Sequence, residues 1–98
     1  HLTRILANEL APWHIRVNAI APGPFPSGMM AYITDHDHKV DKLAENVPAG
    51  RIGNASDIAG LILALCGAGG AFVSGAIIPL DGGMSAEPVS WFDPKDFL

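Results

Sequence analysis

A proline-rich stretch that follows an apolar run is the part of this sequence that could contact a ligand through its backbone. A proline occupies every second position from 22 to 26. Proline fixes φ and has no N–H, so this stretch cannot be a helix interior or a central strand. Gly23, Phe25 and Ser27 keep their N–H groups. The pattern predicts a stiff extended loop, which either only ends a strand or presents backbone donors to a ligand.

The run Asp35-His36-Asp37-His38 contains residue types that bind metals, but its spacing supplies too few ligands. On a helix, His36 and His38 would point to different sides. On an extended segment they would share a face, yet a zinc site needs three or four ligands. We therefore expect a solvated, mobile lid here and no metal site.

Other polar residues near the expected strands and turns are predicted to be structural. Asn18 is expected to hold the proline-rich loop by hydrogen bonds to the backbone, and Ser74 is expected to be structural as well. Arg51 is expected to form a salt bridge or a cap near the helix that follows it. Asp81 is expected to satisfy backbone groups at its Asp-Gly-Gly turn.

The elements that must position the loop alternate between helices and strands. In chain order we expect a helix over 1–11, a strand over 14–20, one or two short helices within 29–46, a helix over 55–66 and a strand over 75–80. Strands separated by helices predict a parallel α/β sheet with a right-handed crossover. Ligands bind such sheets beyond the carboxyl ends of the strands, which favours the proline-rich loop as a site.

The expected helix over 55–66 has a clear start and an unusual composition. Asn54 is its best N-cap, and Asp57, three residues later, is a shortened capping-box partner. The helix is apolar nearly all round, which predicts burial on most sides. Cys66 is accordingly expected to be a small buried thiol.

Composition limits the classes of protein to consider. The 98 residues are 49% hydrophobic and only 16% charged, so we expect apolar surface that is covered by chain beyond this sequence or by a partner. The start at His1, inside a helical pattern, also suggests truncation. The six Lys and Arg are scattered, which argues against nucleic acid as a partner. One cysteine excludes a disulfide framework and suits the reducing cytoplasm, and the longest apolar run, 58–66, is too short to span a membrane.

Four blocks of the sequence, in order and at matching spacing, resemble the C-terminal part of the short-chain dehydrogenases/reductases. The blocks are LTR with LANELA (2–11), IRVNAIAPG (15–23), PAGRIG leading to DIA (48–59) and FVSG leading to IPLDGG (72–83). Residues 24–27 further resemble the branch of 3-oxoacyl-[acyl-carrier-protein] reductases of rhamnolipid synthesis. The resemblance implies the last two strands and flanking helices of a Rossmann-type doubly wound sheet over 1–83, followed by a C-terminal arm over 84–98.

The resemblance also implies a cofactor, NAD or NADP, at the proline-rich loop. The backbone of Phe25 would bond the nicotinamide carboxamide, and the Ser27 hydroxyl would contact the carboxamide or the diphosphate. Pro22 and Gly23 would form the wall against the ring. Met29 and Tyr32 would line the substrate pocket, with ordinary packing in the lid as the alternative for Tyr32.

The catalytic part of such an enzyme lies outside this sequence. The family's phosphate-binding glycine loop, its ribose-reading residue and its catalytic Ser, Tyr and Lys would all precede His1, so no catalytic residue is assigned here and NAD is not distinguished from NADP. Tyr32 has no lysine four residues later, because position 36 is His36. We expect an inactive fragment of a homodimeric or homotetrameric oxidoreductase. It would reduce a small carbonyl compound, with a 3-oxoacyl compound as the specific candidate, or oxidise a secondary alcohol. The alternative is a non-catalytic module that assembles with reductase subunits.

Overall fold

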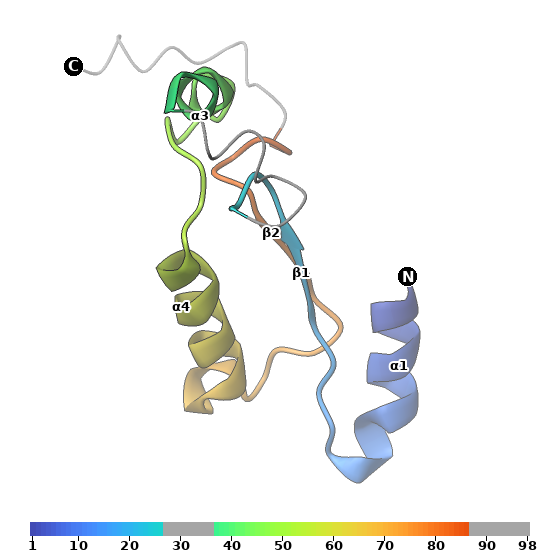
Figure 1. Ribbon diagram of the computed structural model, residues 1–98. Helices are drawn as coiled ribbons and strands as arrows, with labels where there is room; N and C mark the ends of the chain where they lie inside the picture. Colours follow the sequence, from blue (N-terminus) through green and yellow to red (C-terminus); the bar gives the residue numbers. More distant parts are fainter. Residues whose placement is uncertain (27–36, 87–98) are drawn as a thin grey trace, which may run out of the picture.

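The computed structural model describes residues 1–26 and 37–86 (Figure 1). The described elements are the helices α1 (Leu2–Leu10), α3 (Asp37–Ala44) and α4 (Ala55–Cys66), the short 3-10 helices η1 (Ala11–Trp13) and η2 (Ala68–Gly70), and the strands β1 (Ala19–Pro22) and β2 (Ile77–Leu80). The predictions for Ser27, Met29, Tyr32 and His36, and for most of the C-terminal arm, lie outside the described residues.

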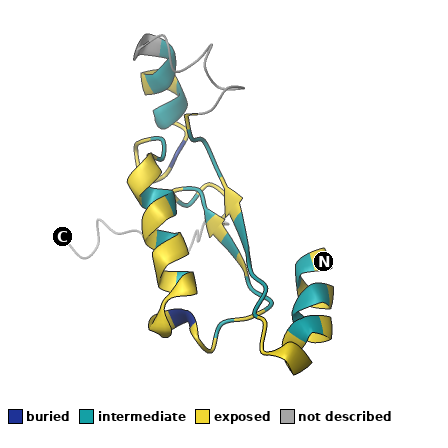
Figure 2. Cartoon of the chain, turned by 60° about the horizontal axis from the view of Figure 1, so that its bottom comes forward, coloured by how far each residue is buried: buried dark blue, intermediate teal, exposed yellow. Residues whose placement is uncertain are grey.

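The two strands form a parallel sheet in which Ala19 pairs with Ile77 and Pro22 with Leu80. The chain passes from one strand to the other through α3 and α4, which confirms the predicted α/β class with a helical crossover. Figures 1 and 2 show α4 and α1 on opposite sides of the strand pair. The proline-rich loop leaves β1 at its carboxyl end.

The strand begins later than predicted, because residues 14–18 follow the 3-10 helix η1 (Ala11–Trp13) without regular strand geometry. Helix α1 ends at Leu10, close to the predicted end, and Pro12 lies in the following η1, whose C-cap His14 is in the left-handed region with φ 60°. The N–H of Ile15 still donates to Leu10 O at 3.4 Å. Regular pairing therefore starts only at Ala19.

Two prolines fit within the strands because of the alternation of a parallel ladder. The N–H groups of Ala19 and Gly23 donate to carbonyls on the β2 side at 2.9 and 3.0 Å. Every second residue of β1 thus bonds to β2, and Pro22 lies at the intervening, outer position. Pro79 takes the equivalent outer position in β2. Neither proline therefore removes a hydrogen bond from the ladder between the two strands.

Helix α4 starts as predicted but is not buried as predicted. Asn54 and Asp57 form a complete capping box. No residue of α4 is buried, Leu63 is 73% exposed, and Cys66 is exposed. The predictions of a buried helix and a buried thiol are therefore wrong for this chain, because the strand pair lies on only one side of α4 and, apart from η2, no other described element packs closely against it.

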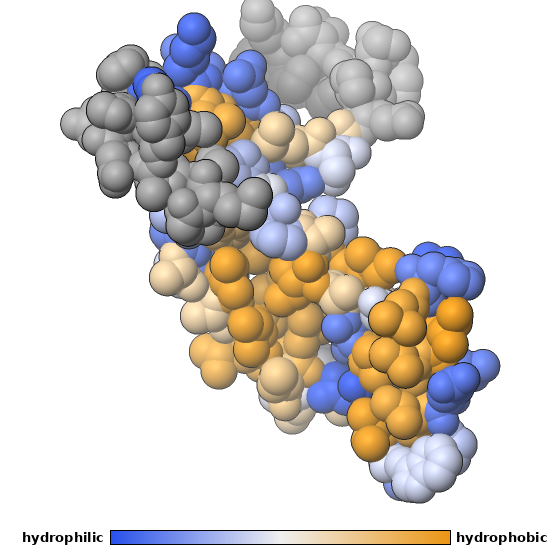
Figure 3. All heavy atoms as spheres, turned by 45° about the vertical axis from the view of Figure 1, so that its right-hand side comes forward, coloured by the Kyte–Doolittle hydropathy of each residue, from blue (hydrophilic) through white to orange (hydrophobic). Residues whose placement is uncertain are grey.

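Apolar surface dominates much of the described part of the chain. Val47 is the one buried apolar side chain among the described residues. Broad hydrophobic areas lie on the face that Figure 3 shows. Large exposed apolar side chains include Leu2, Trp13 and Phe72, at 67%, 69% and 104% exposure. No helix within residues 1–26 and 37–86 has the length and hydrophobicity to cross a membrane.

Candidate functional site

The loop after β1 offers fewer backbone donors than the alternating prolines suggest. The N–H of Gly23 donates to Leu80 O at 3.0 Å and so extends the ladder of the sheet. The expectation that Gly23 keeps its N–H for a ligand is therefore wrong. The N–H of Phe25, between Pro24 and Pro26, has no hydrogen-bond partner among the described residues. Among the described residues of the loop, 23–26, one backbone donor is thus available to a ligand.

Two close approaches hold the loop on either side. On one side, the N–H of Gly53 donates to Pro24 O at 2.9 Å, and a Cβ at position 53 would overlap the Phe25 ring. On the other side, a Cβ at Gly23 would lie 2.7 Å from the Cβ of Asp81. Only glycine leaves room at both contacts. The loop is consequently fixed against the segment before α4 and against the turn after β2.

A small cavity of about 160 Å³ lies between the loop and these neighbours. Its apolar lining comes from Pro24, Phe25, Val47 and Leu80, and Arg51 and Asp57 lie at its polar side. The Phe25 side chain therefore packs toward the interior of the molecule. Its backbone carries the unpaired N–H.

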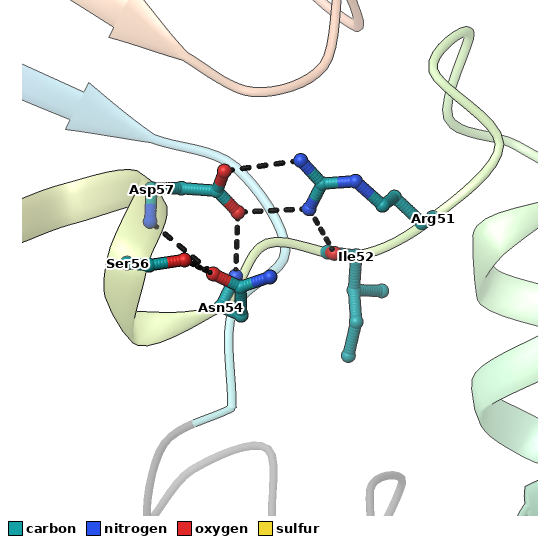
Figure 4. Close-up of polar contacts among 5 residues, drawn as sticks. All are labelled: Arg51, Ile52, Asn54, Ser56 and Asp57. Carbon is teal, nitrogen blue, oxygen red and sulfur yellow. Dashed lines mark hydrogen bonds and ion pairs between the residues drawn. The ribbon is translucent and has the colours of Figure 1, made fainter. Parts of the chain in front are cut away.

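The cluster around the start of α4 is structural (Figure 4). The Arg51 guanidinium donates to both carboxylate oxygens of Asp57, at 2.8 and 3.0 Å, and to Ile52 O at 3.1 Å. This hydrogen bond from Arg51, aided by the one from the N–H of Asn54, lowers the pKa of Asp57 to about 2. The same contact raises the pKa of Arg51. The prediction of a salt bridge near this helix is confirmed.

Asp81 organises the turn after β2, as predicted. Its carboxylate oxygens accept hydrogen bonds from the N–H groups of Gly83 and Ser85, both at 3.0 Å. These bonds, with one from the Ser85 hydroxyl as the largest cause, lower the pKa of Asp81. Gly82 and Gly83 adopt φ values of 63° and 96°, which other residues rarely take. The turn is therefore closely specified by its sequence.

Asn18 and Ser74 bind backbone, but at a different place from the one expected. The Asn18 amide donates to Val73 O at 2.9 Å and accepts from the N–H of Ala76 at 3.0 Å. Ser74 Oγ accepts from the N–H of Val17 at 3.3 Å. The structural roles are confirmed. Asn18, however, holds the segment that leads into β2 and not the proline-rich loop.

Arg16 is a structural residue that sequence reasoning does not identify. Its Nη1 donates to Leu65 O at 2.8 Å and Gly70 O at 2.5 Å, and lies 3.3 Å from Val73 O. The guanidinium thus caps the end of α4 and joins it to the chain before β1. In the sequence, the feature that could have indicated this role is an arginine within an otherwise apolar segment. Among the described residues there is no cluster of three or more side chains that could hold a metal.

Comparisons with known proteins identify the family. A family model described as enoyl-(acyl carrier protein) reductase matches residues 1–85. The rhamnolipids biosynthesis 3-oxoacyl-[acyl-carrier-protein] reductase of Pseudomonas aeruginosa is 43% identical over 82 residues, which cover 84% of this chain and 32% of that protein.

Solved structures agree with this match. The RhlG/NADP active-site complex of Pseudomonas aeruginosa has a TM-score of 0.79 and 42% identity, over 85% of this chain and 34% of that one. A short-chain type dehydrogenase/reductase from Mycobacterium marinum has a TM-score of 0.76 and 33% identity, over 89% and 33% of the two chains. This chain therefore spans about a third of the length of these relatives. The chain belongs to the short-chain dehydrogenase/reductase family, with the corresponding α/β Rossmann-type fold.

Proposed function

We propose that the full-length protein containing this chain is an NAD(P)-dependent oxidoreductase that reduces a carbonyl group or oxidises a secondary alcohol. In this proposal the loop from Pro22 to Ser27 lines the nicotinamide. The supporting observation is the Phe25 N–H, which has no partner among the described residues although the loop around it is fixed by hydrogen bonds. A donor held in place before binding costs less ordering entropy when a ligand arrives.

Each residue of the loop has a separate part in this proposal. The N–H of Phe25 donates to the carboxamide oxygen and so orients the nicotinamide ring. Pro22 and Gly23 form the wall against the ring, Gly23 through its backbone and not through its N–H. The Ser27 hydroxyl contacts the carboxamide or the diphosphate. The cofactor, when bound, supplies or accepts the hydride, and the residues that move the proton belong to the part of the protein beyond this chain.

The choice of cofactor and substrate rests on the relatives. The solved RhlG structure is described as an NADP complex, and the similar Pseudomonas aeruginosa reductase is named for a 3-oxoacyl-[acyl-carrier-protein] substrate. We therefore propose NADP or NAD as the cofactor and a 3-oxoacyl thioester as the first substrate to test. A cytoplasmic homodimer or homotetramer belongs to the same proposal.

The assay of the full-length protein tests this function directly. NADPH or NADH oxidation is followed at saturating cofactor with short and long 3-oxoacyl thioesters and with simple ketones. We expect turnover with at least one carbonyl class. Saturable cofactor binding without turnover of any of them would contradict the proposed reaction, and no cofactor binding would contradict the site as well.

A second candidate is a non-catalytic module that assembles with reductase subunits. The observation that favours it is the exposed apolar surface of α4 and of Phe72, which a protein partner could cover. The coding sequence upstream of His1 separates the two candidates. An in-frame Tyr-x-x-x-Lys directly before His1 supports the enzyme, and a start codon at that point supports the module.

A further inference from the structure

A second hollow borders the same loop and leads to a residue without an assigned role. Its volume is about 460 Å³, within the range of roughly 300–1,000 Å³ for small-molecule sites. Among the described residues it is lined by Ala21–Pro24 of the loop, by Pro79 and by Asp81, Met84 and Ser85 of the following turn. The segment proposed to face the nicotinamide and the turn after β2 therefore share one hollow.

The polar side chains of this hollow are already paired. Both carboxylate oxygens of Asp81 accept backbone N–H groups, from Gly83 and Ser85. The Ser85 side chain is also hydrogen-bonded to Asp81. What remains for a ligand is the surface of the proline rings and of Met84. The hollow is consequently suited to an apolar part of a ligand.

Met84 has a fixed position relative to the loop. Its N–H donates to Asp81 O at 3.3 Å, and the N–H of Ala86 donates to Gly83 O at 3.1 Å. Asp81 in turn lies against Gly23, where no side chain would fit. The Met84 side chain is 45% exposed. An apolar, adaptable side chain thus lines the same hollow as Pro22 and Gly23 of the proposed nicotinamide wall.

We propose that Met84 is a specificity-determining residue, and that its hollow takes the apolar chain of the carbonyl substrate. This inference rests on the proposed function, because the substrate must lie beside the nicotinamide. Larger side chains at position 84 then shorten the chain that fits, and smaller ones lengthen it. Asp81 contributes by fixing the turn that presents Met84.

Met84→Phe and Met84→Ala in the full-length protein test the inference. kcat/KM is measured for a series of 3-oxoacyl thioesters that differ in chain length, and the cofactor dissociation constant is measured in parallel. We expect Met84→Phe to lower the ratio of long-chain to short-chain kcat/KM by about tenfold or more, the scale of one methylene in an apolar pocket. Met84→Ala should raise that ratio. Phe72→Ala, a fully exposed apolar position outside the hollow, is the matched control and should leave the ratio unchanged.

The outcomes separate this inference from the proposed function. A chain-length preference that stays the same in both Met84 variants, with normal cofactor binding and turnover, would overturn the inference alone. If another part of the protein fills the hollow, Met84→Phe should lower the melting temperature and leave the chain-length preference unchanged. That result would also overturn the inference. If the unmodified protein does not bind NADP or NAD, the proposed function itself is overturned.

Discussion

Replacing Phe25 by proline in the full-length protein tests the backbone contact on which the proposed cofactor site depends. Proline removes the one loop N–H that has no partner among the described residues. The neighbours Pro24 and Pro26 already favour extended geometry, which proline also accepts. The substitution therefore removes a donor with limited strain. Phe25→Leu is the matched control, because it keeps the N–H and an apolar side chain.

The magnitude follows from the loss of one hydrogen bond to the bound carboxamide. The carboxamide oxygen left without its donor costs about 1–3 kcal/mol. This free energy corresponds to about 5- to 150-fold weaker cofactor binding. Phe25→Leu loses part of the ring contact with Gly53, which should lower the free energy of unfolding by less than about 1.5 kcal/mol and leave the donor in place.

Cofactor titration of both variants, with circular dichroism as the folding control, is the assay. The proline variant should bind the cofactor more weakly than the leucine variant by the factor given above. Equal dissociation constants for two folded variants would refute the reasoning. The loop would then serve only to end β1.

Three further predictions concern the stability of the full-length protein. Asn54→Ala should lower the free energy of unfolding by about 1 kcal/mol in denaturant titrations, and Asn54→Gly by only a few tenths, because glycine is tolerated as an N-cap. The pKa of Asp57 is about 2 in the folded chain against 3.8 ordinarily, so its stabilising contribution is complete above pH about 4 and is lost as the pH falls toward 2. Thermal melts from pH 5 to pH 2.5 should therefore show a smaller loss of stability for Asp57→Asn than for the unmodified protein, and equal losses would contradict this assignment. Arg16→Met should cost about 2 kcal/mol in denaturant titrations because it leaves carbonyls at the end of α4 without their charged donor, whereas Arg4→Met, on the exposed surface of α1, should stay within about 0.5 kcal/mol.

The features that local sequence determines were predictable. The capping box of Asn54 and Asp57, the salt bridge of Arg51 and the turn of Asp81 each involve residues within a few positions of one another. Their geometry depends on short-range hydrogen bonds, and the sequence contains all the partners. The parallel α/β arrangement also followed from the order of helices and strands.

The features that depend on distant partners were not predictable in the same way. The exposure of Cys66 and of α4 depends on which elements cover them, and a helix that is apolar all round does not specify its cover. The N–H of Gly23 was expected to be available, but the ladder to Leu80 extends one residue past the strand. The contacts of Arg16 join residues about fifty positions apart in the sequence, which no local pattern reveals.

The most direct test of the central claim is a crystal structure of the full-length protein with its nicotinamide cofactor bound. We predict that the carboxamide oxygen lies about 2.9 Å from the Phe25 N, in line with its N–H, and that the ring rests against Pro22 and Gly23. A cofactor bound away from this loop, or a separation well beyond hydrogen-bonding distance at Phe25, would contradict the claim that Pro22 to Ser27 form the nicotinamide site.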